Sequence, residues 1–387
     1  MNFVALAAIV VGVPGVLTAM HLGLLAIASW WYREPVDGSA DPIGFLVLIP
    51  AHNEERLIGA GLEAIMADLR DRDTVLVVAD RCTDRTAEIA RAHGAAVLER
   101  GADETPGRAA ARQAGLDYAC RLSWDAVLML DADSVIEPGF FDACERAMVP
   151  GVDAVQARSE SRPGRSVAQE AALAAFTVQG ITIPRGRDRL GVSVRLRGTG
   201  MAIRREIALA HEFRAPASED LFFTLDLLLD GVRCRHVDRA RLRSQGESAW
   251  GSFGRQKLRY EAGRMMAARQ YAPRLLARAL RARDASCFEA AWFLVSPPFA
   301  TAASMLLVAS ALAAISGSAT LTFLLAAAFV ALVLVLVTGL IQARAAVRTW
   351  IALAAAPWYL VWKVAVQIRA LGSSLRRNNY YEPTARA

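Results

Sequence analysis

The chain has 387 residues, 54% of them hydrophobic, and carries a net charge of +6 at pH 7. This hydrophobic share argues against a purely soluble protein, because soluble domains contain about 45–50% apolar residues. A basic stretch beside a membrane explains the positive charge better than nucleic-acid binding does, so we expect no nucleic-acid partner.

The first 33 residues predict a transmembrane anchor. No Asp, Glu, Lys or Arg occurs between Met1 and Tyr32, and a helix of this length can cross a bilayer. The segment lacks the basic start that a cleavable signal peptide carries. We therefore interpret residues 1–33 as a retained N-terminal anchor.

Residues 43–245 predict one α/β domain. Short β-type runs alternate with helical patterns, and these runs occupy residues 44–50, 74–79, 95–98 and 126–130. The helical patterns between them end near Leu69, Gly94 and Ala119. Strands and helices that alternate at this spacing predict a mostly parallel sheet covered on both faces.

Two aspartates follow the fourth predicted strand, and they predict a metal site. Asp131 and Asp133 are one residue apart, so in an extended chain both carboxylates point the same way while Ala132 points elsewhere. Two converging carboxylates can hold Mg²⁺ or Mn²⁺, and through it a diphosphate. Asp71 and Asp73 have the same spacing but precede a strand in a charged turn, and we interpret them as a solvated loop.

Polar residues also follow the first two predicted strands. Asn53 and Glu54 come after the first, and Asp80 ends the second. Because parallel strands open their carboxyl ends on one side of a sheet, these residues and the aspartate pair should share a cleft. Taken singly, Asn53 could be a helix cap, Asp80 a turn residue and Glu54 a first-turn charge. Together they suit the base, ribose and metal-bound phosphates of a nucleotide.

Two short motifs follow in the same domain. Arg108 comes after Gly107 at a helix start, where its cation can contact a phosphate or remain solvated. Glu219 and Asp220 follow Ser218. If one of these two carboxylates lies beside a substrate hydroxyl, it can accept the proton of that hydroxyl as the oxygen attacks. The alternative is an acidic first turn that Ser218 caps.

Residues 246–288 predict basic helices at the membrane interface. The stretch contains many arginines with Met, Leu and Ala between them, and most of these cations are expected to lie on an anionic lipid surface. It also contains Gln256, Arg259 and Tyr260. Gln256 and Arg259 are three residues apart, so on a helix they share a face.

Residues 289–371 predict the C-terminal membrane segments. No charged residue occurs in 290–342, and Ser316-Gly317-Ser318 divides this stretch, so we expect two spanning helices joined by a tight turn. The uncharged stretch 350–362 is short, and an interfacial helix is favoured there over a third crossing. Residues 372–387 form a tail.

Charge asymmetry predicts the orientation in the membrane. Arg33 follows the first apolar segment, Arg344 and Arg348 follow the second predicted C-terminal span, and the turn between the two spans is uncharged. Basic flanks remain on the cytoplasmic side, so we expect the α/β domain in the cytoplasm. Five scattered cysteines without metal-site spacing agree with a reducing compartment.

Three segments of the α/β domain carry a family resemblance. They are IPAHNEE at 49–55, VVADRCTDRT at 77–86 and LDAD at 130–133. They closely resemble family 2 of the inverting glycosyltransferases, in the exopolysaccharide branch related to cellulose synthases, and the resemblance continues in order to Tyr260. It implies a GT-A-like nucleotide-sugar-binding domain on the inner (plasma) membrane of a bacterial-type cell.

The resemblance also implies roles for the residues of the cleft. The residues that would hold the uridine part of the donor are Asn53, Glu54 and Asp80. Asp131 and Asp133 would hold Mg²⁺ or Mn²⁺ on the donor diphosphate. Arg108 stands where the family usually has a lysine beside a phosphate or the donor sugar.

The two later motifs resemble the acceptor side of the same family. Asp220 stands at the place of the catalytic base, and Glu219 would orient the acceptor or the base. Arg259 would contact the departing diphosphate, while Gln256 and Tyr260 would shape the acceptor site. Tyr260 replaces the family's tryptophan, which keeps a ring that can stack on a sugar but reduces its area.

The sequence therefore predicts a membrane-bound inverting glycosyltransferase that uses a nucleoside-diphosphate sugar, with a UDP-sugar favoured. Its acceptor would be a cell-envelope or exopolysaccharide glycan or a polyprenyl-linked molecule, and its other partners membrane lipids and export subunits. A processive polysaccharide synthase is the alternative, although the few C-terminal segments favour single addition. A non-catalytic nucleotide-sensing scaffold is a weaker alternative, because the acidic motifs are intact.

Overall fold

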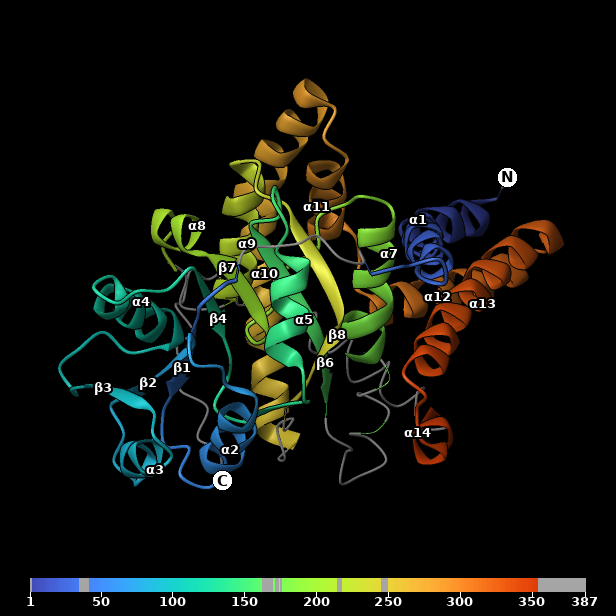
Figure 1. The fold of residues 1–387 in the computed structure, drawn as a ribbon. Coiled ribbons are helices and arrows are strands. Elements are labelled where there is room, and N and C mark those ends of the chain that lie inside the picture. The colour runs from blue at the N-terminus through green and yellow to red at the C-terminus, as the bar shows by residue number, and fades with distance from the viewer. Residues whose placement is uncertain are drawn as a thin grey trace.

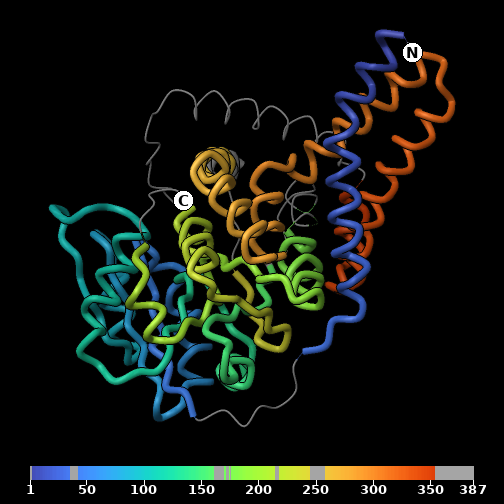
Figure 2. The backbone as a smooth tube through the Cα atoms, turned by 90° about the horizontal axis from the view of Figure 1, so that it is seen from above, coloured from blue at the N-terminus to red at the C-terminus, as the bar shows by residue number. Residues whose placement is uncertain are grey.

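The protein consists of an α/β body with a group of apolar helices beside it (Figure 1). The computed structural model describes residues 2–34, 42–161, 170, 174, 176–213, 218–244 and 250–353. In the view from above, the apolar helices extend away from the body (Figure 2). The predicted tail and most of the predicted interfacial helix lie outside the described residues.

An eight-stranded sheet forms the centre of the body, in the order β3-β2-β1-β4-β7-β6-β8-β5. Its strands are β1 (Phe45–Ala51), β2 (Thr74–Asp80), β3 (Ala96–Arg100), β4 (Ala126–Met129), β5 (Ser134–Ile136), β6 (Ala154–Ser161), β7 (Met201–Arg204) and β8 (Cys234–Ser244). The first four strands pair in parallel, which confirms the predicted α/β fold. β7 runs antiparallel to β4 and β6, and β8 is parallel to β6.

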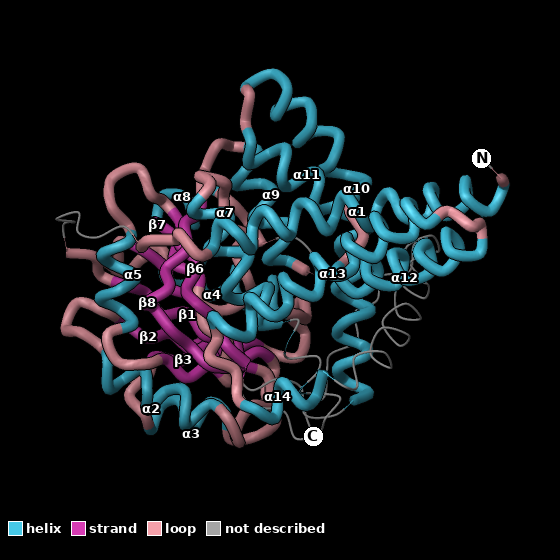
Figure 3. The backbone as a smooth tube through the Cα atoms, turned by 90° about the vertical axis from the view of Figure 1, so that its right-hand side faces the viewer, coloured by secondary structure: helices cyan, strands magenta, loops and turns pink. Residues whose placement is uncertain are grey.

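Helices enclose both faces of this sheet (Figure 3). They are α2 (Ile58–Asp68), α3 (Thr86–Ala92), α4 (Arg108–Ala119), α5 (Phe140–Ala147), α8 (Arg205–Ala210) and α9 (Glu219–Leu229). Because side chains alternate along a strand, Phe45 and Val47 of β1 pack with α2, α3 and α5, whereas Leu46 and Leu48 pack with α4, α8 and α9. The strand is buried on both sides, as expected in a parallel sheet.

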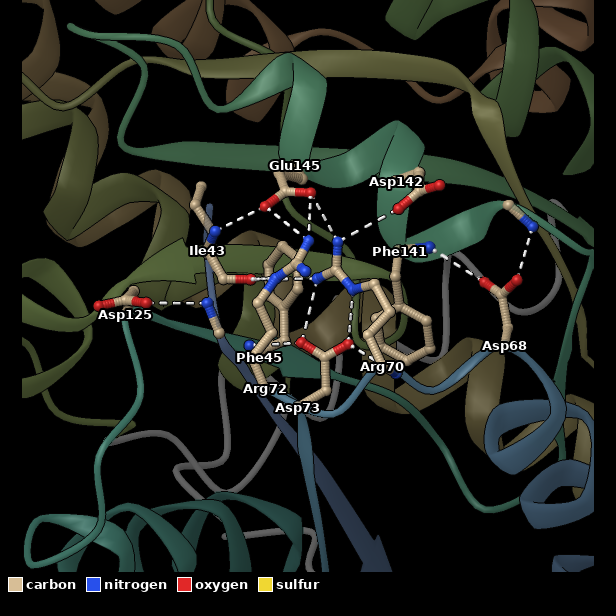
Figure 4. A network of polar contacts seen from close by, with 12 residues as sticks. Ile43, Phe45, Asp68, Arg70, Arg72, Asp73, Asp125, Phe141, Asp142 and Glu145 are labelled. Carbon is tan, nitrogen blue, oxygen red and sulfur yellow. Dashed lines mark hydrogen bonds and ion pairs between the residues drawn. The ribbon is translucent and has the colours of Figure 1, made fainter. Parts of the chain in front are cut away.

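A network of charged side chains surrounds the first residue of β1, at the start of the sheet (Figure 4). The buried carboxylate of Asp73 accepts hydrogen bonds from the backbone N–H of Phe45 at 2.9 Å and from Arg70 Nε at 2.7 Å. Arg70 also pairs with Glu145 at 2.6 Å. The interpretation of Asp71 and Asp73 as a solvated loop is therefore wrong for Asp73, because that side chain satisfies the first donor of β1.

Two helices of the described chain are long and apolar enough to cross a membrane, α1 (Phe3–Ser29) and α13 (Ala319–Gln342). They pack with α12 (Phe299–Ile315) around a common apolar core. A Cβ at Gly15 of α1 would lie 2.8 Å from Leu306 of α12, so the two helices approach closely at a residue without a side chain.

The expected continuous apolar helix beginning near residue 290 is broken in the structure. α11 (Ala285–Val295) and α12 meet at a bend of 63°, and the residues between them include Pro297 and Pro298. Proline cannot donate to a helix and disfavours helical geometry in the preceding residue. Within the described residues, the helices that are long and apolar enough to cross a membrane therefore number two, or three if the bent pair counts as one span.

One end of the group of apolar helices binds directly to the body. Two helical segments of the body lie beside them, the π-helix η1 (Val178–Thr182) and α7 (Ile183–Arg189). Thr182 Oγ1 donates to Gln342 Oε1 at 3.0 Å, and Gln342 Nε2 donates to Ser29 Oγ at 2.7 Å. The Tyr32 hydroxyl donates to the His236 carbonyl at 2.8 Å. These hydrogen bonds join α1, α13 and the sheet domain.

The predicted basic segment forms α10 (Trp250–Ala282), which packs with α9 and α11. At least one of its arginines is not on a lipid surface. Arg264 is 6% exposed and donates through Nη1 to the Ser296 carbonyl at 2.9 Å. This bond satisfies a carbonyl at the end of α11. After α13 the described chain ends in α14 (Val347–Ala352).

Candidate active site

The two aspartates of the predicted metal site follow β4, in the turn toward β5. The Ser134 N–H donates to the Asp131 carbonyl at 2.9 Å, so Asp133 lies in a turn and not in the extended chain that the spacing suggested. Thr199 Oγ1 accepts the Asp131 N–H at 3.1 Å and lies 2.8 Å from Ser134 Oγ. Both carboxylates are largely buried, with 17% of the Asp131 side chain exposed.

The guanidinium of Arg108 interacts with the acidic residues of the site. It begins α4, and its Nη1 lies 3.3 Å from Asp131 Oδ2. The pKa of Arg108 is raised first by Asp131 and then by Glu219, Asp133 and Asp220. Four carboxylates from two separate motifs therefore act on the same guanidinium.

Arg112, which the sequence analysis missed, bridges the two acidic motifs. Its side chain is completely buried, and its Nη1 lies 3.1 Å from Glu219 Oε1 and its Nη2 3.6 Å from Asp131 Oδ1. It also donates to the Gly198 carbonyl. Burial lowers its pKa, and Glu219 opposes that shift most strongly. The spacing of Arg112 from Arg108 on one helix face was the available signal.

Asp220 lies in the first turn of α9, where backbone groups fix its carboxylate. The Gly198 N–H donates to Oδ2 at 3.0 Å, and the Leu221 N–H donates to Oδ1 at 2.8 Å. Burial raises the pKa of Asp220, and the neighbouring Glu219 raises it further. Ser218 occupies the N-cap position of α9 with a φ of 61°, and both acids stand in the first turn, as the alternative expected, but the Ser218 hydroxyl makes no cap bond.

Asp80 ends β2 on the nucleotide side of the predicted cleft. Its carboxylate pairs with Arg100 Nη1 at 2.6 Å and accepts the Gly107 N–H at 3.4 Å. The His52 ring contacts the Asp80 carbonyl at 2.6 Å. Asp80 therefore fixes the loop that leads to Arg108. Its predicted contact with the uridine remains a prediction.

Asn53 and Glu54 connect the loops after β1 and β2. Asn53 has a φ of 55°, and its Oδ1 accepts the Thr83 N–H at 2.8 Å. The Glu54 N–H donates to Thr86 Oγ1 at 2.8 Å. The cap residue of α2 is Leu57, so Asn53 does not cap that helix. It positions the two loops beside each other.

Arg259 and Tyr260 lie on α10, and both are half-buried. Burial lowers the pKa of Arg197, and Tyr260 and Asp220 oppose that shift. Tyr260 and Asp220 therefore both contribute to the electrostatic environment of Arg197. The side chain of Gln256 lies outside the described part of the chain, and the roles of Gln256, Arg259 and Tyr260 remain predictions.

A divalent cation fits the aspartate pair. Asp131 Oδ1 is buried and accepts no hydrogen bond from the described residues, although it lies 3.6 Å from Arg112 Nη2. Within the described ranges, no group of three or more His, Cys, Asp or Glu residues could hold a metal. The protein would thus supply Asp131 and Asp133, and diphosphate and water oxygens would complete the shell, as at other phosphate-bound Mg²⁺ sites.

The arrangement of these residues agrees with the family comparison. A family model described as "Glycosyltransferase like family 2" matches residues 42–263, which is more than half of the chain. The chain belongs to this glycosyltransferase family. No curated protein matches the glycosyltransferase in sequence.

Solved structures resemble the glycosyltransferase in fold. One is the mannosyltransferase PcManGT from Pyrobaculum calidifontis in complex with GDP-Man and Mn²⁺, with 20% identity, a TM-score of 0.58 and coverage of 96% of this chain and 99% of that chain. Another is glucosyl-3-phosphoglycerate synthase from Mycobacterium tuberculosis with Mn²⁺, UDP and phosphoglyceric acid, with 23% identity, a TM-score of 0.42 and coverage of 66% and 82%. The first likeness covers nearly the whole chain and supports the GT-A-like fold of the α/β body.

Proposed function

We propose that this glycosyltransferase is a membrane-bound, metal-dependent inverting enzyme that uses a nucleoside-diphosphate sugar. Its acceptor is a cell-envelope or exopolysaccharide glycan or a polyprenyl-linked molecule. The observation that carries the proposal is Arg112, whose guanidinium joins Asp131 of the metal motif to Glu219 of the base motif. Donor phosphates held at one motif would lie beside a proton acceptor at the other.

The donor side of the proposal rests on the aspartates and the resemblance. Mg²⁺ or Mn²⁺ held by Asp131 and Asp133 would offset the charge of the donor diphosphate as it leaves. The structural neighbour solved with GDP-Man and Mn²⁺ supports this class of ligand, and the motifs favour a UDP-sugar. Arg108 and Arg259 are the residues proposed to contact the diphosphate.

The acceptor side depends on Asp220. In an inverting transfer the acceptor oxygen bonds to the anomeric carbon, the bond from that carbon to the diphosphate breaks, and its electron pair leaves with the diphosphate. The acceptor proton moves to the Asp220 carboxylate. Burial and Glu219 raise the pKa of Asp220, so its carboxylate is a stronger base than an ordinary aspartate.

We further propose that residues 1–33 anchor the enzyme in the membrane and that residues 43–245 form the catalytic domain. Residues 246–288 would form the interface helices, and residues 289–371 would form the rest of the membrane part. The apolar helices α1 and α13 support this division. The catalytic domain would face the cytoplasm, where nucleotide-sugars are made. Two or three spans are few for a polymer channel, which favours single addition or reliance on partner subunits for export.

The test is a screen of purified protein with Mn²⁺ or Mg²⁺ against a panel of nucleotide-sugars, with release of free nucleoside diphosphate as the readout. We expect one donor class to react. Asp220→Asn should reduce the rate by about 10²–10⁴-fold, the usual contribution of a general base, and still bind the donor. Asp230→Asn is the matched control, because Asp230 ends the same helix with 65% of its side chain exposed.

Two results would contradict the proposal. If no nucleotide-sugar is cleaved but donors still bind, the chain is a non-catalytic sensor. If Asp220→Asn and Asp230→Asn react equally fast, Asp220 is not the base. Product length separates the two modes of transfer, because a ladder of long chains would exclude single addition.

A further inference from the structure

Two arginines beside the proposed base have buried donors that nothing in the described chain satisfies. Arg197 immediately precedes Gly198, and Arg195 stands two residues before Arg197. The Gly198 N–H donates to Asp220 Oδ2 at 3.0 Å. The Nη1 atoms of both arginines are buried and have no hydrogen-bond partner among the described residues. Buried guanidinium groups normally have such partners, and the strongest are carboxylates and phosphates.

The two side chains extend to the same side of their loop. Leu196, between them, packs into the core under α4 and α9, and side chains alternate in extended chain. Arg195 Nη2 donates to Gln179 Oε1 at 3.4 Å. A Cβ at Gly180 would lie 3.1 Å from Arg197 Nη1. Both arginines therefore face the π-helix η1, a type of element that often marks functional sites.

The same arginines lie between the base and the apolar helices. The Arg195 guanidinium is 4.0 Å from the ring centre of Phe293, which belongs to α11, the first half of the bent candidate span. On the other side of η1, a Cβ at Gly339 of α13 would lie 2.7 Å from Val178. The two arginines are therefore next to the elements that would meet the membrane.

We propose that Arg195 and Arg197 bind the phosphate group of the acceptor, so that the acceptor is a phosphate-bearing molecule. This inference rests on the proposed function, because it takes Asp220 to mark the acceptor side. A guanidinium fork fits phosphate oxygens in a bidentate manner. The contact with α11 favours a lipid-borne phosphate over a soluble one, and the experiment below separates these two sources.

The donor diphosphate has a different set of cations. Arg108 and the proposed metal lie at Asp131, whose Oδ2 is 3.3 Å from Arg108 Nη1. Arg195 instead contributes to the electrostatic environment of Asp220. One cationic group therefore lies at each end of the reaction site, which is what an enzyme with two anionic substrates needs.

The test measures binding to the purified full chain in detergent, without a donor, by calorimetry. Farnesyl phosphate is the lipid probe, farnesol its phosphate-free counterpart and glycerol 3-phosphate the soluble probe. We expect farnesyl phosphate to bind at least about tenfold more tightly than farnesol, because charged hydrogen bonds are made only by the phosphate. Tighter binding of glycerol 3-phosphate than of farnesyl phosphate would assign the site to a soluble acceptor.

Arg197→Gln should weaken binding of farnesyl phosphate by about tenfold or more and leave farnesol binding unchanged. Arg197→Lys keeps the charge and should recover part of the affinity, which excludes misfolding as the cause of the loss. Arg121→Gln is the matched control, because Arg121 is exposed and the change removes the same charge. It should bind all probes as the wild type does.

Three results would overturn the proposal: equal affinity of the wild type for farnesyl phosphate and farnesol, an equal loss in Arg121→Gln, or displacement of farnesyl phosphate by UDP with Mn²⁺. The last would assign Arg195 and Arg197 to the donor diphosphate. A wild type that cleaves no nucleotide-sugar contradicts only the proposed function, since these binding measurements need no turnover.

Discussion

Arg112→Met is the substitution from which the structure predicts the largest loss of stability at the site. The guanidinium is 0% exposed and contacts Glu219 at 3.1 Å, and it also donates to the Gly198 carbonyl. Methionine keeps the length of the side chain but leaves two buried acceptors without a cation. Removing one partner of a buried ion pair costs about 3–5 kcal/mol, and two lost charge-assisted hydrogen bonds at about 1.5–3 kcal/mol each lead to a similar figure.

The assay is thermal unfolding in detergent, followed by tryptophan fluorescence. In a domain of 150–250 residues, each kcal/mol of lost stability lowers Tm by about 2–4 °C. Arg112→Met should therefore lower Tm by about 6–20 °C. Arg108→Met is the comparison, because 41% of the Arg108 side chain is exposed and an exposed ion pair contributes only about 0–1 kcal/mol.

A double variant tests the cause of the loss. Adding Glu219→Gln to Arg112→Met removes the uncompensated buried charge, so the double variant should regain part of the lost Tm. Equal Tm values for Arg112→Met and Arg108→Met, or no recovery in the double variant, would refute the role of Arg112 as the bridge between the two acidic motifs.

Three further outcomes are expected at the site and in the apolar helices. Burial raises the pKa of Asp220 above its ordinary value of 3.8, and only the unprotonated carboxylate can accept a proton. As the pH is lowered, the midpoint of the fall in kcat/KM should therefore lie above pH 3.8. A kcat/KM that does not change with pH would contradict this. Asp131→Asn should raise the Mn²⁺ concentration needed for half-maximal release of nucleoside diphosphate by about tenfold or more, and an unchanged requirement would remove Asp131 from the metal site. Gly15→Ala should lower Tm, because the new Cβ would lie 2.8 Å from Leu306 and such overpacking reduces the free energy of unfolding by about 1–3 kcal/mol. Gly23→Ala is the control and should change Tm little, because a Cβ there has nothing within 4 Å.

The parallel half of the fold could be predicted because its strands are buried on both faces. β1, β2 and β4 are continuous apolar runs, and such runs are visible without knowledge of their partners. β8 was missed although Ala240 and Leu242 alternate with arginines at 239, 241 and 243, the period of a half-buried strand. β5 has three residues, too few for any periodic pattern.

The acidic motifs of the site could be predicted from local sequence, but the contacts between them could not. Asp131 and Glu219 are far apart in the chain, and the residue that joins them, Arg112, stands in a helix where an arginine usually faces solvent. Its burial depends on packing against Gly198 and Phe213, which is a property of the tertiary structure.

The hydrogen bonds from Ser29 through Gln342 to Thr182 fix helix α1 against the body, so α1 is part of the packed structure of the enzyme. Removing α1 to obtain a water-soluble fragment would uncover the side of α7 and η1 that now lies against it, and would leave the amide of Gln342 without its acceptor. In the membrane arrangement proposed above, side-chain packing would therefore fix the tilt of the reaction site relative to the lipid surface, and acceptors would have to reach the site along the bilayer.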